Sequence, residues 1–224
     1  MRKPKSRIKN RVGISSKFTI MKKLSLLVVL LVSLSFVTKA QMNFGIKAGL
    51  NMATITGDDV TDTKLKPSYQ VGAVAQFQMS DAFSIQPSLI LSGKGTKDSE
   101  VDDYSMNLNY LEVPINAVYS FSGFQVFAGP YLGVGLFGNI NYGDEEVDVE
   151  FTGDVTEDSS MDKVQVNGFD FGFNLGAGYM LNESLQIQAN YGLGLGNLNP
   201  KVNGEDPTNT VNNSVIQLSV SYFL

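Results

Sequence analysis

Hydrophobic and polar residues alternate one by one along most of the chain after residue 40. An alternation with a period of two predicts β-strands that have one apolar and one polar face. In one segment, for example, Phe169, Phe171 and Phe173 are separated by Asp170 and Gly172. The same pattern occurs in eight segments, at residues 43–52, 69–79, 83–94, 111–120, 124–136, 169–179, 185–195 and 216–224.

The connections between these segments alternate between short and long. Three are tight turns, around Asp81, Ser122-Gly123 and Asn182-Glu183. Four are long, at residues 54–66, 96–107, 138–166 and 197–213. Short turns at one end and long loops at the other are typical of membrane barrels. The pattern therefore predicts an all-β fold, an eight-stranded antiparallel transmembrane β-barrel with up-and-down meander topology, and places both termini on the periplasmic side.

The alternative is a soluble barrel that buries the apolar face. Two features favour the membrane barrel. The polar face carries Lys47, Lys94, Glu112 and Asp170 among Gln, Asn, Ser and Gly. The apolar face carries aromatic residues near the short turns on seven of the eight strands, as expected for a girdle at the membrane interface. The girdle residues are Phe44, Phe77, Phe83, Tyr119, Phe124, Tyr179 and Tyr222.

The four charged residues of the polar face have two interpretations. Ionisable groups inside a membrane protein are candidates for function. An eight-stranded barrel, however, has an interior that side chains just fill, and this favours an internal network of ion pairs and hydrogen bonds. Because their strands are neighbours, Lys94 and Glu112 are expected to lie close together.

Glycine and proline predict local features of these strands. Glycines of the polar face are expected to leave room for the aromatic rings of Phe127, Tyr131 and Phe137. Proline cannot donate a ladder hydrogen bond, so β-bulges are expected at Pro87, Pro114 and Pro130.

The first 40 residues have the pattern of an export signal. Lys22 and Lys23 precede an apolar run at residues 24–37, and the small residue Ala40 ends the segment. The run is shorter than the roughly 20 residues that a spanning helix needs, which indicates a signal peptide at residues 21–40. Residues 1–20 are interpreted as an upstream extension or a long basic region, with Met1 or Met21 as the translation start. Residues 41–224 form the predicted barrel domain.

The distribution of charge and the missing residue types exclude several classes of function. Residues 1–40 contain ten Lys and Arg and no acid, whereas the remainder contains seven Lys against all 22 acids. A strongly acidic domain argues against nucleic-acid binding. The absence of Cys and His excludes Cys/His zinc sites, disulfides and a Ser-His-Asp triad. We therefore expect no catalytic residues, no cofactor and no enzymatic activity.

The acids are concentrated in the four long connections, which contain 18 of the 22. A solvated acidic rim is the simplest interpretation. Carboxylate clusters also bind Ca²⁺ or Mg²⁺, although the spacing matches no EF-hand. The third connection also alternates Val and Phe with acids and is expected to extend into a projecting hairpin. Its weak candidates for divalent-ion ligands are Asp144, Glu145, Glu146, Asp148 and Glu150.

Four segments of the chain resemble a known family. They are NYLEVPINAVY (109–119), VFAGPYLGVGL (126–136), FDFGFNLGAGYML (169–181) and ANYGLGLGNL (189–198). With the final IQLSVSYFL, they resemble the PorT-like small outer-membrane β-barrel family over residues 41–224. One departure is that the usual terminal Phe is here the penultimate residue, Phe223.

The resemblance implies a protein of the outer membrane of a Gram-negative bacterium. Its partners would be the outer-membrane lipid and, during biogenesis, the outer-membrane assembly machinery. The expected role is structural or interactive, with acidic loops presented at the surface. The alternatives are a narrow pore or transporter for small solutes, and an accessory component of a protein secretion machine with an unknown surface or secretion partner.

Overall fold

The computed structural model describes residues 41–58, 60–61, 63–98, 104–156 and 162–224. The predicted upstream extension at residues 1–20 and the predicted signal peptide at residues 21–40 lie outside the described residues. In the described part of the chain, no helix is long and apolar enough to cross a membrane.

Each of the eight alternating segments forms a long strand. Most of the strands extend further toward the long connections than the alternation predicts, whereas their ends at the short turns match the prediction closely. The long strands are β1 (Gln41–Gly57), β3 (Lys66–Gln78), β4 (Phe83–Asp98), β5 (Tyr104–Phe121), β6 (Phe124–Tyr142), β10 (Phe169–Met180), β11 (Leu185–Gly194) and β13 (Val211–Phe223).

Five short strands lie within the long connections. They are β2 (Thr63–Lys64), β7 (Glu145–Phe151), β8 (Asp154–Val155), β9 (Val164–Val166) and β12 (Lys201–Val202). β2 pairs with β4, β7 pairs with β6, and β9 runs parallel to β7. β8 and β12 form a separate parallel pair.

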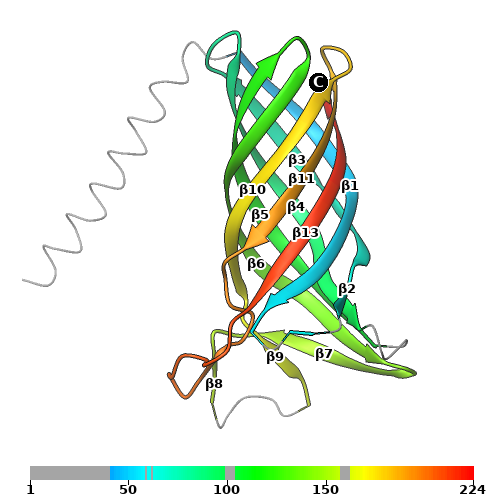
Figure 1. Cartoon of the computed structure of the whole chain (residues 1–224), viewed down its shortest axis with the longest axis vertical. Helices are drawn as coiled ribbons and strands as arrows, with labels where there is room; N and C mark the ends of the chain where they lie inside the picture. Colours follow the sequence, from blue (N-terminus) through cyan, green and yellow to red (C-terminus); the bar gives the residue numbers. More distant parts are fainter. Residues whose placement is uncertain (1–40, 59, 62, 99–103, 157–161) are drawn as a thin grey trace, which may run out of the picture. The chain divides into compact units, whose positions relative to one another are not determined.

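The long strands pair with their neighbours in sequence, all antiparallel, from β1 through β3, β4, β5 and β6. The order continues from β6 to β10, β11 and β13. β13 also pairs with β1, over a register that runs from Gly45↔Phe223 to Gly57↔Val211. Each long strand therefore has a partner on both edges, and Figure 1 shows them running obliquely around a common interior. Such pairing satisfies the backbone groups that lipid cannot hydrogen-bond.

The tight turns and the long connections lie at opposite ends of these strands, called here the short-turn end and the long-loop end. The β5–β6 turn consists of Ser122 (φ 50°) and Gly123 (φ 86°), the positive angles that a type I′ hairpin requires. In the β10–β11 turn, the side-chain oxygen of Asn182 accepts hydrogen bonds from the amides of Ser184 and Leu185. The C-terminus lies at the short-turn end (Figure 1).

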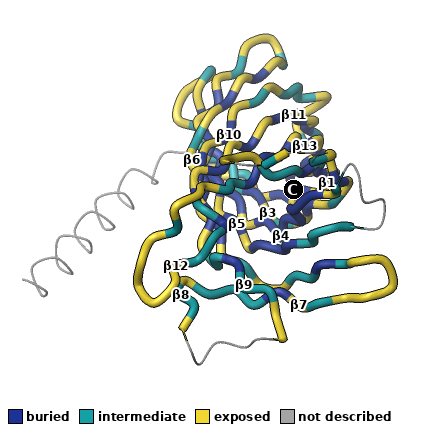
Figure 2. The backbone as a smooth tube through the Cα atoms, turned by 60° about the horizontal axis from the view of Figure 1, so that its bottom comes forward, coloured by how far each residue is buried: buried dark blue, intermediate teal, exposed yellow. Residues whose placement is uncertain are grey.

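The two faces of the strands have opposite exposure. Apolar side chains point outward, and Leu175 is 68% exposed. Polar side chains point inward, and Asp170, Gln186 and Ser92 are fully buried. Figure 2 shows buried and exposed positions alternating along the strands, with exposed positions predominating at the turns and the projecting loops. This arrangement is the inverse of a soluble barrel and matches the polarity of a membrane barrel.

Inward-facing glycines accommodate aromatic rings at two positions. A side chain at Gly176 would overlap the ring of Phe127, and one at Gly172 would overlap the ring of Tyr131. Both rings are buried. The same prediction was wrong for Phe137, which is 53% exposed. The register of β5 against β6 shifts beside this residue, and the extra residue in β6 reverses the inward and outward positions.

The predicted bulges at the prolines are also wrong. The registers of β3–β4, β4–β5 and β5–β6 are the same on both sides of Pro87, Pro114 and Pro130. Pairing lapses for two residues beside each of these prolines and then resumes in register. The loss of one N–H donor is therefore absorbed by a local gap in the ladder rather than by an inserted residue.

The long-loop end has an apolar core of its own. β7 forms the expected projecting hairpin with β6, and β9 pairs along β7. The ring of Phe151 covers Gly135 and packs edge-on against Tyr110, with 5.4 Å between the ring centroids. We call this group the outer cap; its buried members are Leu108, Tyr110, Ile140, Val149, Val166 and Leu198.

Candidate functional site

Lys94 is the centre of a buried charge cluster in the strand interior. Its ammonium contacts the carboxylate of Glu112 on the neighbouring strand β5, as expected, although Glu112 lies opposite Ile90 in the strand register. It also donates a hydrogen bond of 2.8 Å to Asp170 Oδ2 on β10. The side chain of Lys94 is only 3% exposed. An ion pair at this depth needs good geometry to offset the cost of removing three charges from water.

Two tyrosines and an asparagine complete the cluster. The ammonium of Lys94 lies 4.4 Å from the ring centroid of Tyr131 and 5.6 Å from that of Tyr110, in cation–π contact with both. Asp170 Oδ2 accepts further hydrogen bonds from Asn213 at 3.1 Å and from the Tyr131 hydroxyl at 3.4 Å. The cluster thus joins side chains from β4, β5, β6, β10 and β13.

Lys47, the fourth charged residue of the polar face, is not part of the cluster. Its ammonium donates a 2.9 Å hydrogen bond to Gln188 Oε1. Gln188 donates to Gln86, which donates to Gln186, and Gln186 donates to Gln125 at 2.6 Å. Lys47 therefore begins a chain of amides that fills the interior on the short-turn side of the cluster.

A second chain of hydrogen bonds crosses the interior. Asn190 donates to Gln217 at 2.6 Å, and Gln217 donates to Asn51. Asn51 donates in turn to Ser92 and to the carbonyl of Gly93, the residue before Lys94. Polar side chains thus contact one another across the strands, as expected for an interior that is filled rather than open.

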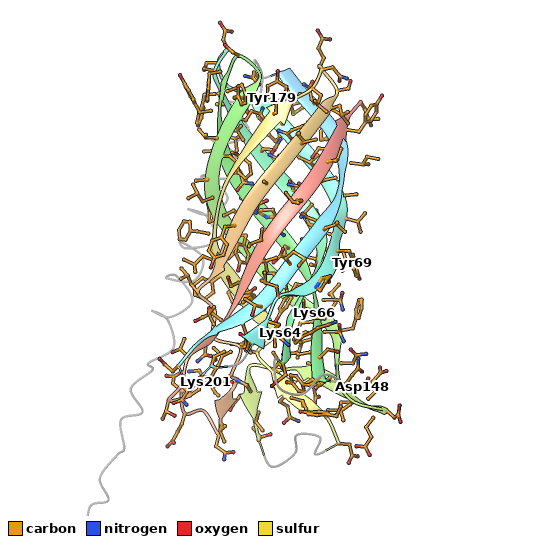
Figure 3. All side chains as sticks on the ribbon, turned by 45° about the vertical axis from the view of Figure 1, so that its right-hand side comes forward. Lys64, Lys66, Tyr69, Asp148, Tyr179 and Lys201 are labelled. Atoms are coloured by element: carbon orange, nitrogen blue, oxygen red, sulfur yellow. The ribbon has the colours of Figure 1, made fainter. Side chains whose placement is uncertain are left out.

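The seven girdle residues lie at the short-turn end. Five of them are outward-facing and exposed: Phe44, Phe83, Tyr119, Phe124 and Tyr222. Phe77 and Tyr179 are half-buried. Phe124 and Tyr179 pack edge-on with 4.8 Å between ring centroids, and Tyr179 is labelled in Figure 3.

The five acidic residues considered as divalent-ion ligands do not gather into one site. Glu146, Asp148 and Glu150 share one face of β7, Glu145 points to the other face, and Asp144 lies in the turn before this strand. Asn139 donates a 2.7 Å hydrogen bond to Glu146, and Gln165 donates to Glu150. Within the described ranges, no three metal-binding side chains come together.

The alternation alone did not identify three members of the charge cluster. Tyr110 lies on the polar face just before the segment that begins at Leu111, and Asn213 lies in what was expected to be a loop. The ring of Tyr131 was expected inside the barrel, in space left by glycines, but its contacts with Lys94 and Asp170 were not expected. Extending the period of two beyond each predicted strand would have placed Tyr110 and Asn213 on the inner face.

The sequence of the chain matches a protein family over residues 33–199, more than half of its length. That family is described as Outer membrane protein beta-barrel domain. The chain belongs to this family. Outer-membrane barrels of this family reside in outer-membrane lipid, and they are generally not enzymes. No curated protein matches the sequence.

Several solved outer-membrane proteins are similar to this family member. Ail, the attachment invasion locus protein of Yersinia pestis, is 10% identical, covering 82% of this chain and 99% of Ail, with a TM-score of 0.47. Neisserial surface protein A is 12% identical, covering 80% and 96%, with a TM-score of 0.46. OprG from Pseudomonas aeruginosa is 16% identical, covering 83% and 97%, with a TM-score of 0.38. The family assignment rests on the sequence match.

Proposed function

We propose that this family member is a closed eight-stranded barrel that serves as a structural or surface-interaction protein of the outer membrane, with no enzymatic activity. The pairing of β13 with β1, and of β10 with both β6 and β11, supports closure. An up-and-down barrel of eight strands then has no free edge in the lipid.

The observation that carries the functional proposal is the filled interior. The Lys94 cluster connects five strands, the amide chain from Lys47 occupies the short-turn side, a second chain crosses the interior, and the outer cap packs at the long-loop end. An eight-stranded barrel leaves room inside for side chains only. The narrow pore or transporter is therefore the less favoured function.

The surface available for interaction is the long-loop end, which we place outside the cell, with both termini in the periplasm after removal of residues 21–40. Its connections contain most of the acids of the chain. Like charges at one end of a barrel repel other acidic surfaces and attract basic ones, so a partner here would carry basic residues.

Liposome swelling tests the choice between a filled barrel and a pore. Proteoliposomes containing the full chain are diluted into solutions of small sugars and amino acids, with a known porin as the positive control. We expect no swelling above that of empty liposomes. Swelling at a rate that falls with solute size would instead support the pore.

An accessory role in secretion is the alternative that the PorT-like resemblance implies. A crosslinking pull-down of the intact protein from native outer membranes distinguishes this accessory role from an independent structural or surface-interaction role. Repeated capture of components of a secretion machine would support the accessory role. Capture of the general assembly machinery alone fits a barrel that acts by itself.

A further inference from the structure

A polar cavity lies at the long-loop end, on the flank of the strands, and Lys94 of the charge cluster is one of its lining residues. Its volume is about 420 Å³. Figure 3 shows Tyr69, Lys66 and Asp148 following one another along this flank. We call it the flank pocket; the side chains used below are Lys66, Ser68, Tyr69, Asn109, Glu146 and Asp148.

Lys66 is a buried cation with no counterion. It is the first residue of β3, is only 6% exposed, and shares the inward parity of Ser68 and Gln70. Among the described residues, the ammonium of Lys66 makes no ion pair and no hydrogen bond, whereas those of the buried Lys47 and Lys94 both have partners. Removing a charge from water without pairing it is costly. The ammonium of Lys66 is therefore available to an anionic group that enters the pocket.

Neutral donors lie beside Lys66. Asn109 Oδ1 accepts a 2.9 Å hydrogen bond from the hydroxyl of Tyr69, which fixes the amide and leaves its NH₂ group as a donor. The hydroxyl of Ser68 lines the same wall. The Lys94 ammonium also reaches this cavity, but Glu112 and Asp170 already hold it. This part of the pocket thus offers a cation and neutral donors, and no carboxylate that is not already paired.

Carboxylates form another part of the pocket. Glu146 and Asp148 are two residues apart on β7, so both point to the same face of that strand, and both are exposed. Asn139 donates to Glu146 Oε1 at 2.7 Å and orients that carboxylate. In the part of the chain that the structure describes, no lysine lies within ion-pair distance of either acid. These carboxylates are therefore available to a cationic group.

We propose that the flank pocket binds a small zwitterionic ligand whose anionic group pairs with Lys66 and whose ammonium group pairs with Glu146 and Asp148. An anion without an ammonium would be repelled by the two carboxylates, and a simple amine would be repelled by Lys66. A ligand with both charges gains from both parts of the pocket. Aminoalkyl phosphates have this chemistry, either as free solutes or as the headgroup of a lipid.

The test is isothermal titration calorimetry, in which each probe is titrated into the full chain held in nanodiscs of phosphatidylglycerol. The probes are O-phosphoethanolamine, inorganic phosphate and ethanolamine. We expect O-phosphoethanolamine to bind at least about tenfold more tightly than either fragment. Equal binding of phosphate and O-phosphoethanolamine, or no binding of O-phosphoethanolamine, would overturn the proposal.

Three variants separate the two parts of the pocket. Lys66→Gln should abolish binding of O-phosphoethanolamine, and Lys66→Arg should retain it. Asp148→Asn should lower the affinity for O-phosphoethanolamine several-fold and raise the affinity for inorganic phosphate. Lys201→Gln is the matched control, because Lys201 is an exposed loop lysine paired with Asp206 at 2.7 Å. Unchanged binding in a Lys66→Gln protein that retains heat-modifiable migration would refute the assignment.

The two sources of the ligand are distinguished by the lipid. If the site takes a lipid headgroup, nanodiscs of phosphatidylethanolamine should lower the apparent affinity for free O-phosphoethanolamine several-fold, and Lys66→Gln should remove this difference. If the site takes a free solute, the affinity should be the same in both lipids. Either result supports the flank pocket, provided that binding depends on Lys66.

Discussion

Lys94 of β4 and Asp170 of β10 are 76 residues apart in the sequence, yet Lys94 Nζ donates a 2.8 Å hydrogen bond to Asp170 Oδ2. β5 and β6 lie between these strands in the sheet, so the bond crosses the interior. Such a contact ties non-adjacent strands together, which ladder hydrogen bonds cannot do.

The Lys94→Met variant should be strongly destabilised. It leaves the buried carboxylates of Glu112 and Asp170 without a cation, a change that typically costs about 3–5 kcal/mol. The free energy of unfolding, measured by urea titration in lipid vesicles, is the readout. Lys47→Met should cost less, because it leaves only the neutral oxygen of Gln188 unpaired.

Two further variants control for the loss of a lysine. Lys201→Met changes an exposed surface pair and should be nearly neutral. Adding Glu112→Gln and Asp170→Asn to Lys94→Met should recover part of the lost stability, since the buried charges are then gone. If the Lys94→Met and Lys201→Met proteins had the same free energy of unfolding, the charge cluster would contribute nothing to stability.

The outward apolar face can be tested at Leu175. Leu175→Arg places a charge in the middle of the outward face and should cost about 2–4 kcal/mol if that face contacts lipid. Val202→Arg is the matched control, because Val202 is also exposed but lies in the loop strand β12. The same urea titration compares the two. Equal small costs would contradict the membrane assignment of the face.

Removing the last three residues, Tyr222, Phe223 and Leu224, should prevent membrane insertion. Tyr222 pairs with Ile46, and Phe223 pairs with Gly45. The amide of Leu224 donates to the carbonyl of Phe44. Loss of these residues exposes the end of β1 to lipid, where unpaired backbone groups are costly. Heat-modifiable migration on gels is the readout.

The control for this truncation is Leu224→Ala, which keeps the backbone pairing and should insert normally. Normal migration of the truncated chain would mean that the β1–β13 pairing is dispensable at this end.

The alternation of residues predicts all eight long strands, because a strand with one lipid face and one polar face must alternate strictly. It also places Lys94 and Glu112 on the inner faces of neighbouring strands, where their side chains reach each other although Glu112 lies opposite Ile90 in the register. It does not reveal Asp170 as the second partner of Lys94. That contact crosses the interior, and its geometry depends on how the whole sheet curves.

The long-loop end is the least predictable part. Lys66 and Asn213 were expected in loops, but β3 and β13 begin there and continue the inward positions of their strands. The outer cap joins Leu108 of β5 with Val149 and Val166 of the third connection and Leu198 of the fourth. Short apolar runs in such connections carry too little periodicity to show which of them meet.

Single-channel recording in planar lipid bilayers tests the filled interior most directly. The full chain, with insertion verified by heat-modifiable migration, is reconstituted in concentrated KCl across an applied voltage. The filled barrel predicts no steady current above that of the bare bilayer. Stable, stepwise current increments that scale with the amount of inserted protein would contradict it.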